Sequence, residues 1–109
     1  MRWFEIVAQM SEKNKAYVIV TVLEVKGSSP REEGAKMIVS GDKSYLSIGG
    51  GNLEYQAIAL SRELILEGGV VSRIEDFPLG PKLGQCCGGK VRLLFESFPA
   101  EAVRISIFG

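Results

Sequence analysis

Two adjacent cysteines, Cys86 and Cys87, are the residues of this chain with the clearest capacity for chemistry. They lie in a glycine-rich segment, and Gln85 directly before them offers an amide donor and acceptor. Thiolates are soft ligands that suit copper(I), zinc or molybdenum, and they can also carry persulfide sulfur. The segment therefore predicts a soft-metal or sulfur site. The alternative interpretation is two incidental small residues in a loop.

The composition of the chain limits which metal and catalytic sites it can form. The chain has no histidine, so the commonest general base and metal ligand is missing. Two cysteines alone do not complete the usual four-ligand structural zinc site. A formal net charge of +0 and the lack of basic runs argue against nucleic-acid binding. No segment approaches the roughly 20 apolar residues of a membrane span. We expect a cytoplasmic protein whose thiols stay reduced.

A second candidate site is the run of Gly49, Gly50, Gly51 and Asn52 between an expected strand and an expected helix. Free N–H groups at a helix N-terminus favour an anion, and glycines let a phosphate approach the backbone. Asn52 is a candidate N-cap, or Glu54 closes a capping box in which Gly51 is the cap. A tight turn that binds nothing is the alternative.

The third candidate combines Ser28, Ser29 and Arg31 on a turn that Pro30 stiffens. Two hydroxyls and a guanidinium make a plausible anion contact. Acidic residues follow at once, so Arg31 balancing their charge is the alternative reading.

The elements that position these candidates follow from hydrophobic periodicity. Helical spacing predicts helices over 3–12 and 53–67, and runs rich in β-branched residues predict strands over 16–26, 35–40, 44–48, 70–77 and 90–98. In the second helix the apolar stripe is Leu53, Ala57, Leu60 and Leu64, with Ser61 on the solvent side. The prediction is a small α+β (or α/β) domain with a mixed or antiparallel sheet of about five strands.

The domain is expected to occupy residues 1–99, because 109 residues suit one domain. Residues 100–109 are interpreted as a linker and the first strand of a truncated Rossmann-like domain, since an apolar strand followed by glycine opens such units. A plain edge strand is the alternative.

The candidate motifs occur in one order and together resemble the XdhC/CoxI family of xanthine dehydrogenase accessory factors. The resemblance covers about residues 15–98, and the Gly-Gln-Cys-Cys-Gly-Gly string is its most specific part. The motifs are Gly27-Ser28-Ser29-Pro30-Arg31 with Gly34-Ala35-Lys36-Met37, then Gly49-Gly50-Gly51-Asn52-Leu53-Glu54, and last Leu79-Gly80-Pro81-Lys82-Leu83-Gly84-Gln85-Cys86-Cys87-Gly88-Gly89.

The resemblance implies a maturation factor with no turnover of its own. Such proteins bind the molybdenum cofactor (molybdopterin), hold it while a cysteine desulfurase supplies sulfur, and pass it to an apo molybdenum hydroxylase. Cys86 and Cys87 would then face the metal or carry transient sulfur. The other expected cofactor contacts are Gly49–Gly51, Asn52, Glu54, Ser28, Ser29, Arg31 and Gln85. Many relatives carry cysteine where this chain has Asn52, so a third thiol ligand is missing here.

Two other functions remain open from the sequence. One is a dithiol redox protein that uses Cys86 and Cys87, although adjacent cysteines form a strained ring. The other is a structural or assembly module that forms a homodimer through a sheet edge near Val103.

Overall fold

The computed structural model describes residues 2–27, 32–78 and 89–100. They form two helices and a five-stranded sheet, which confirms the α+β prediction. The elements are α1 (Trp3–Glu12), β1 (Tyr17–Lys26), β2 (Lys36–Ser40), β3 (Ser44–Tyr45), α2 (Gly51–Glu67), β4 (Val71–Pro78) and β5 (Lys90–Phe98). The predicted sites at Ser28–Arg31 and Gln85–Cys87, and the expected strand after residue 100, lie outside the described residues.

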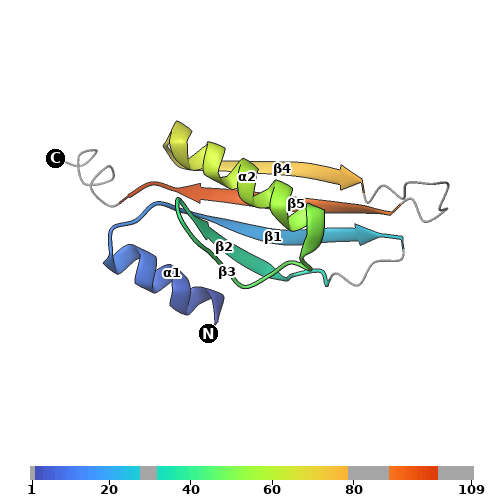
Figure 1. The fold of residues 1–109 in the computed structure, drawn as a ribbon, viewed down its shortest axis with the longest axis horizontal. Coiled ribbons are helices and arrows are strands. Elements are labelled where there is room, and N and C mark those ends of the chain that lie inside the picture. Colours follow the sequence, from blue (N-terminus) through green and yellow to red (C-terminus); the bar gives the residue numbers. More distant parts are fainter. Residues whose placement is uncertain (1, 28–31, 79–88, 101–109) are drawn as a thin grey trace.

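The sheet has the strand order β3-β2-β1-β5-β4, and each of these pairings is antiparallel (Figure 1). Neighbours in sequence form the two outer parts, β1-β2-β3 and β4-β5. The pairing of β1 with β5 joins these parts. The sheet therefore takes the antiparallel form of the expected architecture.

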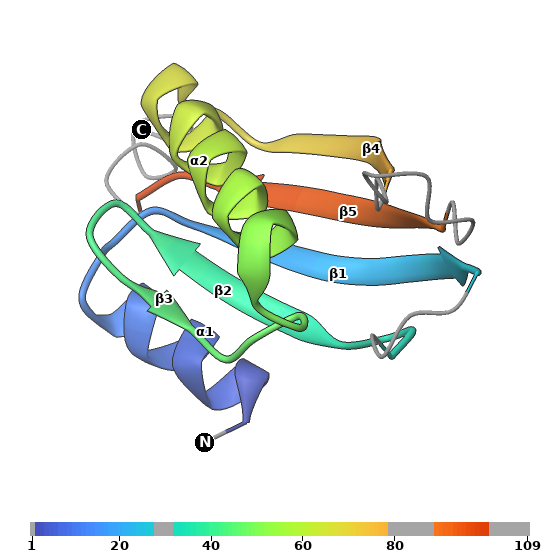
Figure 2. The same cartoon turned by 45° about the vertical axis from the view of Figure 1, so that its right-hand side comes forward.

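Helix α2 lies across one face of the sheet and packs against β1, β2 and β5 (Figure 2). Alternate residues of the strands point toward it, as the two-residue period of a strand requires. The main core lies between the helix and the sheet and contains Val18, Val20, Val22, Met37, Val39, Ile48, Leu53, Ala57, Leu64, Val91, Leu93 and Phe95.

Helix α1 covers part of the opposite face. Its Ile6 and Met10 pack with Tyr17, Ile19 and Ile38 in a second, smaller core. The first six residues of β1 are consequently buried on both faces, which explains their nearly unbroken apolar character. Neither described helix is both long enough and apolar enough to span a membrane.

A β-bulge at Leu23 changes which side chains near the end of β1 point toward the core. Val22 pairs with Leu93 but Glu24 pairs with Arg92, so Leu23 is the extra residue. Without the bulge, Glu24 would share the core-facing side of Val22, because alternate residues of a strand share a face. The bulge instead turns the Glu24 carboxylate to the outer face and returns Val25 to the core side.

Three details differ from the sequence prediction. The strand expected over 44–48 ends at Tyr45, and Leu46 takes a positive φ of 68°. Helix α2 begins at Gly51, two residues earlier than expected. Ser61 was assigned to the solvent side but is fully buried, because the buried stripe of α2 runs through Leu53, Ala57, Ser61 and Leu64.

Ser61 generates the first prediction, because its buried hydroxyl has no hydrogen-bond partner among the described residues. Ser61→Ala should raise the free energy of unfolding by about 1 kcal/mol, since it removes an unsatisfied polar group and favours the helix. Urea unfolding measures this. The control is Ser11→Ala at an exposed position of α1, which should change stability by less than about 0.5 kcal/mol. If Ser61→Ala instead destabilised the protein, the hydroxyl of Ser61 would not be an unsatisfied buried group.

Candidate functional site

One end of the sheet collects the attachment points of two predicted motifs. Lys26 ends β1 and is the register partner of Lys90, which begins β5 and also faces Pro78 at the end of β4. We call the end formed by Lys26, Pro78 and Lys90 the motif end (Figure 1). The chain leaves β1 there toward Ser28–Arg31, and it leaves β4 there toward Gln85–Cys87. Both segments thus leave the same end of the sheet, from β1 and β4 on the two sides of β5, although they are far apart in sequence.

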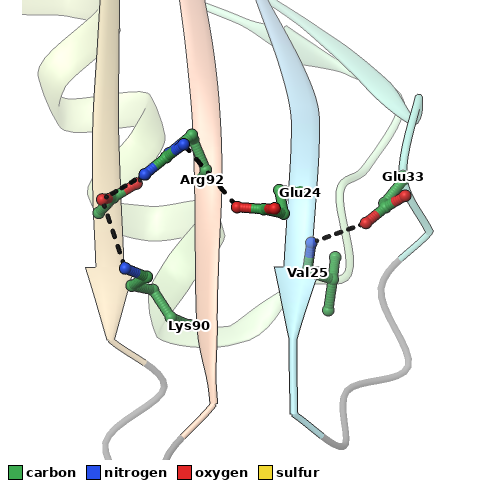
Figure 3. A network of polar contacts seen from close by, with 6 residues as sticks. Glu24, Val25, Glu33, Lys90 and Arg92 are labelled. Atoms are coloured by element: carbon green, nitrogen blue, oxygen red, sulfur yellow. Dashed lines mark hydrogen bonds and ion pairs between the residues drawn. The ribbon is translucent and has the colours of Figure 1, made fainter.

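The chain that follows Ser28–Arg31 is tied back to β1 by two hydrogen bonds. The Glu33 carboxylate accepts a hydrogen bond from the Val25 N–H at 3.0 Å (Figure 3). The Gly34 N–H donates to the Val22 carbonyl at 2.7 Å, with Gly34 at a φ of 91° that glycine adopts readily. These contacts hold the chain beside β1 where it returns to the sheet after the segment.

A charge network links three strands beside the motif end on the outer face of the sheet (Figure 3). Arg92 donates two hydrogen bonds to the Asp76 carboxylate, at 2.8 Å from Nε and 3.2 Å from Nη2. Lys90 Nζ lies 3.6 Å from the same carboxylate, and Arg92 Nη1 lies 3.8 Å from Glu24. The hydrogen bonds from Arg92 lower the pKa of Asp76 below the ordinary value of 3.8.

Lys26 differs from the lysine opposite it. Lys90 is paired with Asp76, whereas Lys26 is exposed and makes no ion pair with any residue in the described ranges. Its charge is therefore available to an anion at the motif end, within the limits that solvent screening sets.

At the candidate site Gly49–Asn52, the Glu54 carboxylate reaches back over the start of α2. Its Oε1 accepts hydrogen bonds from the Ser47 hydroxyl at 2.6 Å, the Ile48 N–H at 3.2 Å and the Gly50 N–H at 3.1 Å. The Ser47 hydroxyl in turn accepts one from the Gly49 N–H at 3.0 Å. A carboxylate is favoured here by the helix dipole and satisfies donors that would otherwise bond to water.

This geometry corrects the expected caps. The N-cap of α2 is Gly50, so neither Asn52 nor Gly51 caps the helix. Glu54 performs the backward reach of a capping box, but one residue later in the helix than expected. Gly50 and Gly51 have φ values of 75° and 69°, and a Cβ on either would meet no atom within 4 Å. Backbone conformation, rather than a crowded neighbour, therefore accounts for these glycines.

The chemistry of an anion site changes accordingly. A phosphate approaching Gly49–Gly51 would meet the Glu54 carboxylate, which already accepts from Ile48 and Gly50. The contacts predicted for Gly49–Asn52 and Glu54 with a cofactor stay predictions. Over the described ranges, no three histidine, cysteine or acidic residues gather in a way that could hold a metal ion.

Sequence reasoning missed Ser47 and the Glu24–Arg92–Asp76–Lys90 network. The signal for Ser47 was a hydroxyl residue just before the triple glycine with an acid soon after it. The signal for the network was weaker, because its members are distant in sequence and meet through strand register.

Comparison with solved structures defines the class of fold. The chain resembles the crystal structure of a xanthine dehydrogenase from Bacillus halodurans, with a TM-score of 0.68 and 24% sequence identity. The match covers 89% of this chain and 30% of that one, so the chain spans less than a third of its structural relative. At this identity the likeness establishes a shared fold. A comparison with curated proteins finds no match.

The family follows from the sequence model that matches residues 10–77, described as the XdhC and CoxI family. This stretch runs from the end of α1 through most of β4 and includes the triple glycine. The chain belongs to the XdhC and CoxI family, which confirms the resemblance seen in its motifs.

The capping role of Glu54 is testable through stability. Glu54→Ala should lower the free energy of unfolding by about 1–2 kcal/mol, because the hydroxyl of Ser47 and two backbone N–H groups lose their acceptor. Glu54→Gln should lose less, since its amide oxygen still accepts. The matched control is Glu63→Ala, an exposed acid on the same helix. Equal losses in the Glu54→Ala and Glu63→Ala variants would argue against the cap.

The charge network gives a pH prediction. Because folding lowers the pKa of Asp76, the Asp76–Arg92 pair stabilises the folded protein fully at a pH above 3.8, the ordinary pKa of the carboxyl group. That contribution is lost as the pH falls through the folded-state pKa. In Arg92→Gln, a carboxyl titration followed by NMR should place the Asp76 midpoint closer to 3.8.

Asp42 provides the internal control for this titration. Its pKa is also lowered, but chiefly by a hydrogen bond from Ser40, so its midpoint should not move in Arg92→Gln. An Asp76 midpoint that is the same in both proteins would show that Arg92 does not set it.

Proposed function

We propose that this protein is an accessory factor for a molybdenum hydroxylase. It would bind the molybdenum cofactor, hold it while a cysteine desulfurase provides sulfur, and release it to the apoenzyme. The observation that carries the proposal is membership of the XdhC and CoxI family over residues 10–77. The shared fold with a xanthine dehydrogenase structure is consistent with it. The protein itself would bind and position, without turnover of its own.

The motif end offers chemistry that suits this cofactor. The chain toward Ser28–Arg31 leaves the end of β1, and the chain through Gln85–Cys87 returns to the sheet at the start of β5, which is paired with that end through Lys26 and Lys90. The cofactor combines a phosphate with a soft, sulfur-ligated metal. Hydroxyls, Arg31 and the exposed Lys26 suit the phosphate, while Cys86 and Cys87 suit the metal or a transferable sulfur. When bound, the cofactor supplies the molybdenum centre on which the client enzyme depends.

The contacts of Glu54 shift the expected phosphate position. A carboxylate seated on the backbone at the start of α2 opposes a second anion there, since like charges repel in a partly desolvated site. We therefore propose that the phosphate binds at the motif end, near Lys26, rather than at Gly49–Gly51. Gly49–Gly51 then serve mainly to shape the turn into α2.

The proposal is tested by spectroscopic titration of the full chain with molybdenum cofactor. Cys86→Ser/Cys87→Ser should weaken binding by about tenfold or more, equivalent to about 1.4 kcal/mol or more. Lys26→Ala should weaken it less, and the loss should shrink at high salt because the contact is electrostatic. Lys13→Ala, an exposed lysine in the turn after α1, is the matched control and should bind as the unaltered protein does.

Two outcomes would count against the proposal. If the unaltered chain does not bind the cofactor, the proposed function is wrong. If the Cys86→Ser/Cys87→Ser variant binds the cofactor and supports sulfuration as the unaltered chain does, the thiols do not have the proposed role.

A further inference from the structure

Within residues 2–27, 32–78 and 89–100, strand β4 forms one edge of the sheet. Among the described strands it pairs with β5 alone, and its other edge presents a row of backbone N–H and C=O groups. Edge strands are usually short or covered, because such a row is a template for another strand. β4 is eight residues long and mostly exposed or half-buried. The edge is therefore long enough to pair with a further strand.

The residues of β4 are self-complementary about Ile74. When a second copy of the strand lies antiparallel with Ile74 opposite Ile74, Arg73 faces Glu75 of the second copy, and Glu75 faces its Arg73. Cross-strand pairs of opposite charge stabilise a sheet, and like charges directly opposite destabilise it. The order of charges therefore favours this register.

The positions of these charges within one copy support the arrangement. Arg73 and Glu75 share the face of the sheet that carries α2, because their register partners are Phe95 and Leu93. Arg73 Nε lies 2.6 Å from Glu75 Oε2, and the two side chains are 45% and 35% exposed. Two copies would place four such groups in an alternating square, with like charges on the diagonals. Each group would keep its present neighbour and gain a second one.

The apolar residues of β4 match in the same register. Ile74 is 57% exposed on the outer face and would contact its counterpart in the second copy. Val71 would lie opposite Phe77, and both already pack against the main core. Apolar contact would thus extend across the join at its two ends, on either side of the charged square, while the exposed isoleucines would be covered on the other face.

We propose that β4 pairs with β4 of a second copy of this chain about a two-fold axis at Ile74. The two five-stranded sheets then form one continuous antiparallel sheet. A closed two-fold contact of this kind uses the same surface on both copies and leaves neither β4 edge exposed. This inference is independent of the proposed cofactor function, and it uses a different edge from the one expected near Val103.

The register has a consequence for the cysteine segments. Pro78 faces Val70 of the second copy, so the two chains leave their β4 strands at opposite ends of the joined edge. Eight residues of strand separate these points by roughly 25 Å. Each copy then keeps its own motif end, and the arrangement does not favour one metal site built from four shared thiols.

Charge exchange tests the pairing by sedimentation equilibrium of the full chain. Arg73→Glu and Glu75→Arg should each raise the dimer dissociation constant by roughly tenfold or more, because four like charges then meet. An equimolar mixture of the two variants should form a heterodimer, since every facing pair is again opposite in charge. The double variant Arg73→Glu/Glu75→Arg should dimerise as the unaltered chain does.

The same measurements can overturn the proposal. A chain that is monomeric at all accessible concentrations has no such interface. Single variants that dimerise like the unaltered chain would show that the contact lies elsewhere, and a mixture that stays monomeric would exclude the register. Circular dichroism confirms that each variant is folded, which is expected because both positions are on the surface.

Cross-linking tests the register directly. In a Cys86→Ser/Cys87→Ser background, Ile74→Cys should give a covalent dimer under mild oxidation, since facing Cα atoms in an antiparallel pair lie within disulfide range. Ser72→Cys in the same background is the matched control, because position 72 faces Asp76 rather than itself. Efficient cross-linking of Ser72→Cys, or none of Ile74→Cys, would contradict the proposed register.

Discussion

Where β1 lies against β5, the valines of the first strand and the alternate residues of the last strand form the centre of both the sheet and the core. Val18, Val20 and Val22 face α2 beside Phe95 and Leu93. A slip of one residue would turn Arg92 and Glu96 toward the core, at a cost of several kcal/mol for each unpaired charge. The register is therefore strongly specified. Everything else, including the neighbouring ends of β1, β4 and β5, depends on it.

The bulge at Leu23 links this central pairing to the motif end. It lets Val25 continue the core beside Val91 while Glu24 joins Arg92 on the outer face. After this one extra residue, β1 is no longer fully buried, and its last residues lie beside charged side chains. The outer-face ion pairs are too exposed to add much stability. Their better-supported effect is to hold three strands in a defined arrangement where two motif-bearing segments begin.

Much of the fold could be predicted because periodicity reports burial. The five strands and two helices lie close to their expected positions, and the nearly unbroken apolar run of 16–26 corresponds to the first six residues of β1, which are all buried. The candidate site was less predictable. Glu54 was recognised as a capping residue, but the cap itself was assigned to Gly51 or Asn52 rather than Gly50. Glycines adopt positive φ so readily that a run of three leaves the first helical residue undetermined.

The sequence by itself determined the type of each element, the family and the residues with reactive chemistry, because these depend on local pattern and on motif order. Tertiary structure decided which elements meet. Strand register placed Asp76, Arg92 and Glu24 together, and the packing of α2 on the sheet buried Ser61. Such contacts between distant residues leave no local trace in the sequence. Packing also assigned the Glu54 carboxylate to the backbone donors before α2. A sequence shows which groups exist, but the energy of burying them together selects their partners.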